Sequence, residues 1–157
     1  MTEKSIMETR LIRIDIVPNE QELISLLGEK IYRYYSEICT NIISFLSPDL
    51  ENWSYAGRRG KYYHGYWITP KSIKADLYLI QGHITCEFHF NKRFFQKILK
   101  RRELLKSETM QKAVDYSIKY NEEYGRGYYV SVVIWGEEEF QDMLEIIKTV
   151  ATSKKNT

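Results

Sequence analysis

The chain has 157 residues, of which 43% are hydrophobic and 28% charged, a composition typical of a folded globular domain and not of a disordered chain. No apolar run approaches the roughly 20 residues that a membrane-spanning helix needs, and the polar N-terminus lacks the apolar core of a signal peptide. Two cysteines outside any CxxC pattern, Cys39 and Cys86, indicate free, buried thiols in a reducing compartment. We therefore expect a cytoplasmic, single-domain protein with no membrane partner, a core at about residues 18–150 and loose ends at 1–9 and 152–157.

Positive charge is concentrated in the middle of the chain. Residues 51–106 carry 12 Lys and Arg against 4 Asp and Glu, whereas both flanking thirds are net acidic. One interpretation is internal complementarity, in which acidic helices flank a basic centre. The other is a basic patch for an anionic partner such as a nucleic acid.

The predicted elements begin with an extended arm or short edge strand at residues 10–17, where apolar and polar residues alternate. Apolar residues then recur at helical spacing from Leu23 to Phe45, behind Asn19 as the capping residue. Interior glycine destabilises a helix, so Gly28 is expected to divide this stretch into two helices. The N-terminal third is therefore predicted to be helical.

A run of strands follows, predicted at residues 62–69, 74–80 and 83–90, with Gln81-Gly82 as the tight hairpin turn between the last two. The remaining elements are two helices at about 93–102 and 107–123, a strand at 128–135 and a final helix from residue 137. This order lacks the regular βαβ alternation of a parallel sheet. We predict an α+β fold, an antiparallel sheet of about five strands with a three-stranded meander at its centre and helices packed on one face.

The two-residue turn at Gln81-Gly82 predicts the pairing of its flanking strands, with Ile80 facing His83. Alternation then gives one apolar face, formed by Ala75, Leu77, Leu79, Ile84, Cys86 and Phe88, and one polar face, formed by Lys74, Asp76, Tyr78, Thr85, Glu87 and His89. A slip of one residue would mix the two sets, so the consistent apolar face supports this register.

In this register Asp76 lies directly opposite Glu87, and like charges in that position are destabilising. The compensation is a shared proton, a bound cation, or a bridging Lys or Arg such as Lys74, Lys61 or Arg126. Bridging is the commonest arrangement. His89 next to the pair makes Asp76, Glu87 and His89 a hard-metal hypothesis, although no HExxH or Cys/His cluster accompanies it.

Tyrosine and tryptophan are dense between residues 53 and 78, next to several cations. Aromatic rings with adjacent arginines suit planar or anionic ligands, whereas the alternative is tyrosines that bridge core and surface. The candidate ligand-binding residues are Arg58, Arg59, Tyr66, Tyr78 and Arg126. The helix near residues 93–102 adds a second cationic surface, because its spacing places Phe94, Phe95, Ile98 and Leu99 inward and Lys92, Arg93, Lys97, Lys100 and Arg101 outward. That surface is either solvated or a contact for phosphate.

Several short motifs occur in an order that resembles a known family. They are Trp53-Ser54-Tyr55, Gly65-Tyr66-Trp67, Leu77-Tyr78-Leu79, Tyr124-Gly125-Arg126 and the terminal Leu144-Glu145-Ile146-Ile147-Lys148. Together they span roughly residues 20–148 and resemble the bacterial "domain of unknown function 3788" proteins. The resemblance implies a compact cytoplasmic α+β domain and assigns no activity.

Three functional hypotheses follow. The first is a non-catalytic module that binds a small anionic or planar ligand, or a protein partner, on the polar aromatic sheet face, with no cofactor. The second is nucleic-acid binding through the basic middle third of the chain. The third is an enzyme or metal-handling protein that uses Asp76, Glu87 and His89, although neither cysteine has a partner histidine at a recognisable spacing.

Overall fold

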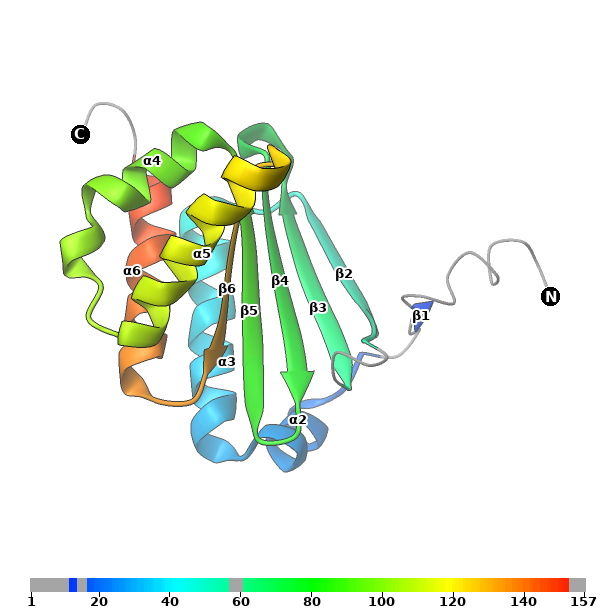
Figure 1. Ribbon diagram of the computed structural model, residues 1–157. Coiled ribbons are helices and arrows are strands. Elements are labelled where there is room, and N and C mark those ends of the chain that lie inside the picture. Colours follow the sequence, from blue (N-terminus) through cyan, green and yellow to red (C-terminus); the bar gives the residue numbers. More distant parts are fainter. Residues whose placement is uncertain (1–11, 14–16, 57–60, 153–157) are drawn as a thin grey trace.

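The computed structural model describes residues 12–13, 17–56 and 61–152, which form an antiparallel sheet and the helices packed against it (Figure 1). Six strands pair in chain order, and every neighbouring pair is antiparallel. They are β1 (Ile12–Arg13), β2 (Leu50–Tyr55), β3 (Tyr62–Ile68), β4 (Ile73–Ile80), β5 (His83–Phe90) and β6 (Tyr128–Ile134). Five long strands thus form an up-and-down meander with the short β1 at one edge, which confirms the predicted α+β class.

Five α-helices lie within the described residues: α2 (Glu20–Leu27), α3 (Glu29–Asn41), α4 (Lys92–Lys100), α5 (Glu108–Tyr124) and α6 (Glu137–Ala151). The predicted cap Asn19 is confirmed, and Asn91 and Ser107 cap α4 and α5 in the same way, because each side chain accepts a hydrogen bond from a first-turn backbone amide. Gly28 separates α2 from α3 at φ +85°, a conformation that favours glycine. In the part of the chain that the structure describes, none of the helices has the length and apolarity needed to span a membrane.

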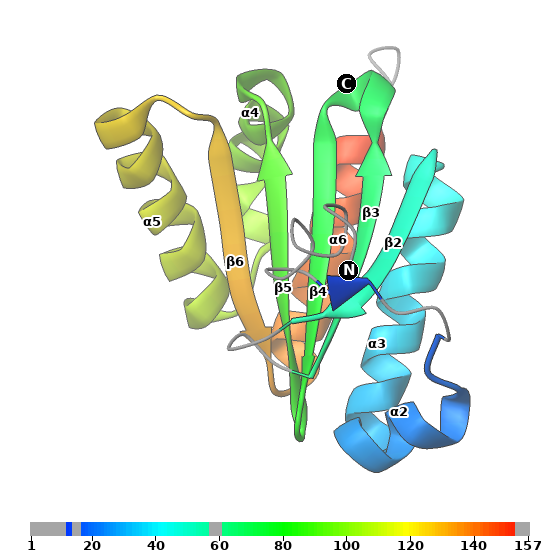
Figure 2. The same cartoon turned by 90° about the vertical axis from the view of Figure 1, so that its right-hand side faces the viewer.

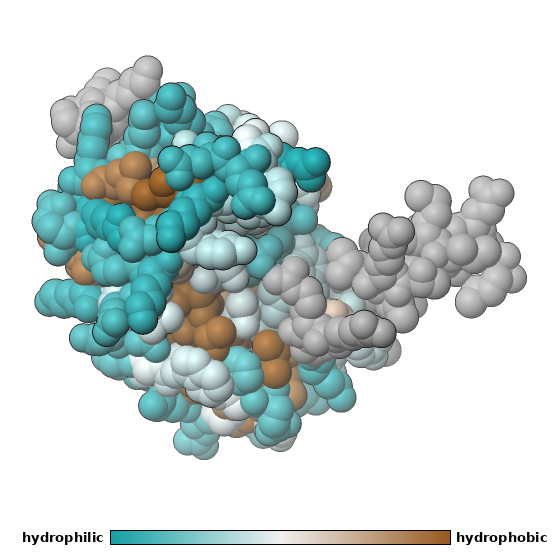
Figure 3. Space-filling model, viewed as in Figure 1, coloured by the Kyte–Doolittle hydropathy of each residue, from teal (hydrophilic) through white to brown (hydrophobic). Residues whose placement is uncertain are grey.

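The two faces of the sheet differ in what covers them. Figure 2 shows α6 behind the sheet and α5 beside edge strand β6, with no described helix in front. The face toward α3, α4 and α6, here called the covered face, carries the predicted apolar set and packs with these helices into one hydrophobic core. Hydrophilic residues dominate the outer surfaces of α4 and α5 (Figure 3). The opposite face, here called the open face, carries the predicted polar set.

Three local predictions needed correction. Strand β2, Leu50–Tyr55, was not among the predicted strands, because the polar residues of LENWSY conceal the strand pattern. The first helical region also ends differently from the helix predicted to continue to Phe45. The α-helix α3 ends at Asn41, a π-helical turn, Ile42–Leu46, follows it, and Ser47 then adopts φ +49°. In α4, Phe94, Phe95 and Ile98 are buried as predicted, but Leu99 is exposed.

Candidate functional site

The open face is built from rows of side chains that run across the strands. The predicted register of β4 and β5 is confirmed, with Ile80 opposite His83 and Asp76 opposite Glu87. One row crosses four strands: Trp67 of β3 pairs with Lys74, Lys74 with His89, and His89 with Tyr129 of β6. Because directly paired residues share a face, these four side chains form one line, here called the platform row.

The platform row contains two contacting pairs, a ring with a cation and a ring with a ring. The Lys74 ammonium lies 4.7 Å from the centroid of the Trp67 ring, and Trp67 is 42% exposed. The His89 and Tyr129 rings are stacked, with centroids 4.1 Å apart and planes 2° apart. Tyr120 of α5 meets Tyr129 edge-on at 5.3 Å. The row therefore presents half-exposed rings supported by their neighbours.

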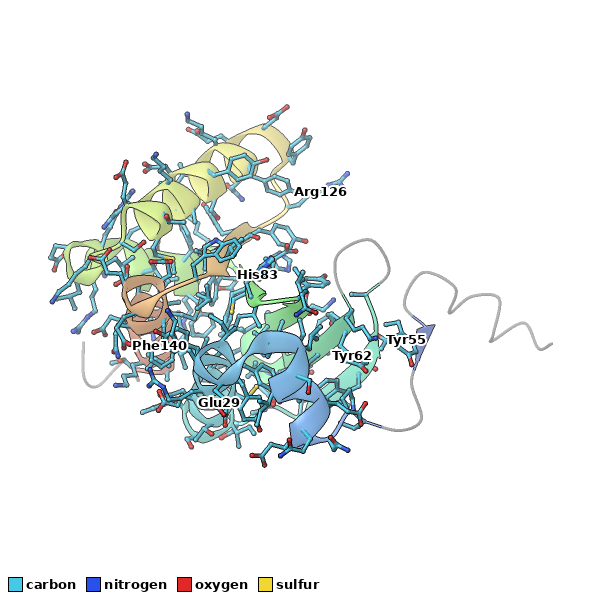
Figure 4. The ribbon with its side chains drawn as sticks, turned by 90° about the horizontal axis from the view of Figure 1, so that it is seen from below. Glu29, Tyr55, Tyr62, His83, Arg126 and Phe140 are labelled. Carbon is cyan, nitrogen blue, oxygen red and sulfur yellow. The ribbon has the colours of Figure 1, made fainter. Side chains whose placement is uncertain are left out.

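The loop between α5 and β6 fixes one end of the row. Its Arg126 side chain is exposed, and Figure 4 shows it at the end of α5. His89 Nε2–H donates to the Arg126 carbonyl at 3.1 Å, which fixes the orientation of the imidazole. The predicted site residue Arg126 thus joins the platform through its backbone, and its guanidinium lies at the rim.

The carboxylate pair occupies the next row of the open face. The Tyr63 hydroxyl donates to Asp76 Oδ1 at 2.5 Å, and the Lys74 ammonium lies 3.7 Å from Asp76 Oδ2. Burial, followed by the charge of Asp76, raises the pKa of Tyr63, so that phenol stays a donor. Lys74, one of the three cations named from the sequence, therefore supplies a positive charge beside Asp76. Asp76 thus has structural partners in Tyr63 and Lys74.

Tyr63 can reach Asp76 because Gly65, which lies between them on the sheet face, has no side chain to block the Tyr63 ring. The Tyr63 ring lies across Gly65, so that a Cβ built there would fall 2.1 Å from the Tyr63 hydroxyl oxygen. Gly65 pairs with Asp76 across the strands, which places the hydroxyl beside the carboxylate. The glycine of the Gly65-Tyr66-Trp67 motif thus has a packing reason.

The structure separates the predicted ligand-binding residues. Tyr66 lies on the covered face, opposite to the prediction, because β3 pairs Tyr63 and not Tyr66 with Tyr78. Tyr78 lies on the open face but is buried and packs against Tyr63, with ring centroids 5.4 Å apart. Arg58 and Arg59 fall outside the described residues. Within the described residues no three His, Cys, Asp or Glu side chains are placed to hold a metal ion, so the metal hypothesis for Asp76, Glu87 and His89 has no support there.

A second polar centre lies on the covered face, and sequence reasoning missed it. His64 is 3% exposed and lies between the rings of Trp53 and Tyr66, at centroid distances of 4.0 and 4.6 Å. His64 Nε2 is 2.6 Å from Glu51 Oε2, and its Nδ1 is 2.7 Å from the Tyr35 hydroxyl. The arrangement fits a neutral imidazole that donates from Nε2 and accepts at Nδ1.

The thiol of Cys39 completes this group, at 3.9 Å from His64 Nδ1. Burial raises the pKa of Cys39 to about 12, although hydrogen bonds with Tyr66 and Tyr35 oppose the rise. Burial also lowers the pKa of His64, against the influence of Glu51. The His64 centre, meaning Tyr35, Cys39, Glu51, His64 and Tyr66, therefore holds a protonated thiol and a neutral imidazole at neutral pH, which is unsuited to a thiolate nucleophile.

Solvent meets the His64 centre at Glu51. An open pocket of about 520 Å³ reaches Glu51 and Tyr66 between the π-helical turn and β2. Cys39 comes from α3, His64 from β3 and Glu51 from β2, so these residues meet only through tertiary packing. Strand alternation in 62–68, which sets His64 on the same face as Tyr62 and Tyr66, is the one signal that could have placed the histidine toward the helices.

Comparisons with protein-family models, with curated proteins and with solved structures give no match for this chain. The resemblance to the "domain of unknown function 3788" proteins therefore stays a prediction. The two sheet faces and the residues on them are therefore the basis of the functional proposal.

Proposed function

We propose that the chain is a non-catalytic binding module whose platform row holds a small planar ligand with a negative charge. The observation that carries the proposal is the continuous line of Trp67, Lys74, His89 and Tyr129 on the open face, in front of which no described helix lies (Figure 2). Half-exposed rings lined up across strands are a stacking surface for planar groups.

Electrostatics support the same choice of ligand. The Lys74 ammonium is held beside the Trp67 ring, at 4.7 Å from its centroid, so a group stacked near that ring meets a cation. Arg126, whose backbone carbonyl binds His89, adds an exposed guanidinium at the other end of the row. Stacking on an aromatic side chain contributes about 1–3 kcal/mol per planar ring. A planar anion therefore has favourable contacts along the whole row.

A non-catalytic role is supported by the state of the His64 centre. Burial keeps its thiol, that of Cys39, protonated at neutral pH. Asp76 of the carboxylate pair also has structural partners in Tyr63 and Lys74. We further propose a reducing compartment such as the cytoplasm. The support is that Cys39 and Cys86 are both buried and free.

Adenosine monophosphate is a suitable probe because it joins a planar base to a phosphate. Its affinity is measured by calorimetry for the wild type, Trp67→Leu and Trp135→Leu. Trp135 is a matched control, since it is 57% exposed and follows β6 at the opposite end of the sheet, stacked on His83. We expect Trp67→Leu to weaken binding by about tenfold or more and Trp135→Leu to leave it unchanged.

Both variants should keep the circular dichroism and melting temperature of the wild type, because both side chains are about half exposed, Trp67 at 42% and Trp135 at 57%. The proposal is contradicted if the wild type does not bind the nucleotide. It is also contradicted if the two variants lose affinity equally, because binding would then not be located at the platform row.

A further inference from the structure

Three cations gather around one aromatic ring next to the platform. The Phe94 ring lies 5.7 Å from Lys71 Nζ, 5.4 Å from Arg93 Cζ and 5.3 Å from Lys97 Nζ. Lys71 comes from the 3-10 turn between β3 and β4, whereas Arg93 and Lys97 come from α4. This group of Lys71, Arg93 and Lys97, here called the basic cap, is therefore assembled from two separate elements.

In the basic cap, the charges of Lys71 and Arg93 are poorly balanced by their described neighbours. The first turn of α4 contains Lys92 and Arg93 and no acidic residue, although the N-terminal end of a helix is itself positive. Among the described residues, neither Lys71 nor Arg93 forms an ion pair with a carboxylate. Lys97 donates to the Thr152 carbonyl at 2.5 Å. An external anion would relieve this repulsion.

The basic cap and the platform row lie at the same end of the sheet. The turn that carries Lys71 joins the end of β3, just after Trp67, to the start of β4, just before Lys74. Helix α4 likewise begins two residues after the end of β5, where His89 lies. The row itself crosses three strand spacings, about 14 Å in all. The row is thus longer than one nucleotide. Because α4 packs on the covered face, a strand that reaches the basic cap from the row passes over this end of the sheet.

We infer that the platform row and the basic cap together bind single-stranded nucleic acid, with bases against the rings and backbone phosphates at Lys71 and Arg93. The inference rests on the proposed function and names the ligand class of the same surface. A single strand fits because its unstacked bases can lie on aromatic side chains of a sheet, whereas the bases of a duplex are already stacked on one another. An anionic membrane would use the cap but leave the rings of the platform without a role.

The test is fluorescence anisotropy with a labelled single strand of about ten nucleotides, within the usual range of site sizes. A duplex of the same sequence and vesicles of anionic phospholipid are measured beside it. The variant Lys71→Gln/Arg93→Gln removes two cap charges. The matched control Lys100→Gln/Arg101→Gln removes two exposed charges from the other end of α4, away from Phe94.

We expect the single strand to bind more tightly than adenosine monophosphate and more tightly than the duplex. The cap variant should bind it about tenfold more weakly at low salt, and its salt dependence should fall by about 0.7 for each of the two lost phosphate contacts. The control variant should keep the wild-type salt dependence. Trp67→Leu should weaken single-strand binding as well, because the same rings hold the bases.

The outcomes separate this inference from the proposed function. If the mononucleotide binds at Trp67 but the single strand binds no more tightly, the nucleic-acid inference is overturned and the binding module stands. If neither binds, both fail. Equal losses in the cap and control variants overturn the inference, because unspecific charge would then explain the binding. Vesicle binding that depends on the cap, without single-strand binding, overturns it in favour of a membrane surface.

Discussion

Each face of the sheet holds a histidine stacked on an aromatic ring, and the two histidines have opposite surroundings. On the covered face, His64 is enclosed by Trp53 and Tyr66, and both ring nitrogens meet side-chain partners. On the open face, His89 is half buried against Tyr129 and bonds only a backbone carbonyl in the contacts described above. We infer that the first histidine stabilises the fold and the second belongs to a surface that binds. The predictions below separate these roles.

The largest expected difference is in stability. His64→Ala leaves a cavity and removes the partner of Tyr35 and Glu51, so it should lower the free energy of unfolding by about 3 kcal/mol. His89→Ala removes a half-buried side chain from the open face and should lower the free energy of unfolding by less than about 1 kcal/mol. Urea unfolding of both variants measures this directly. Equal losses would show that the two faces do not divide their roles in this way.

A smaller loss is expected at Gly65, which tests the packing of the open face. Gly65→Ala places a Cβ 2.1 Å from the Tyr63 hydroxyl and forces that side chain away from Asp76, at a cost of about 2 kcal/mol. Gly136→Ser is the control, since no atom lies within 4 Å of a Cβ there and serine suits the N-cap of α6. Thermal unfolding compares them. An unaffected Gly65→Ala protein would contradict the contact between Tyr63 and Asp76.

The smallest effect concerns pH. Because burial lowers the pKa of His64 from its ordinary 6.5, the unfolded chain takes up a proton there before the folded chain does. The stability that His64 contributes is thus present above about pH 6.5 and is lost as the pH falls below it, with a slope of at most about 1.4 kcal/mol per pH unit for one proton. His64→Gln should remove this part of the slope. A steeper slope in the variant would instead indicate an imidazolium stabilised by Glu51.

The sequence predicted the central hairpin best, because a two-residue turn at Gln81-Gly82 leaves one register and an apolar face confirms it. The pairing of Asp76 with Glu87 followed from that register alone. Tyr66 was placed on the wrong face because β3 reaches β4 through a 3-10 turn, Thr69–Lys71, whose length does not reveal the phase of the strand. Alternation shows which residues of one strand share a face. The connection between two strands decides which of those faces align with each other.

The remaining features depend on contacts between distant segments. Cys39 and His64 are 25 residues apart on a helix and a strand, and no spacing rule links them. The platform row needed the register of β6 against β5, which pairs Tyr129 with His89 across an intervening pair of helices. Residue chemistry was therefore readable from the sequence, whereas the assembly of those residues into sites required the tertiary fold.

The most direct test of the binding claim uses the three tryptophans as reporters, because each lies in a different region: Trp53 at the His64 centre, Trp67 in the platform row and Trp135 at the far end of the sheet. Their indole N–H signals are followed by proton–nitrogen NMR during titration with adenosine monophosphate. We predict that the Trp67 signal shifts progressively while those of Trp53 and Trp135 stay in place. A shift confined to Trp53 or Trp135, or none at all, would contradict the placement of the site on the platform row.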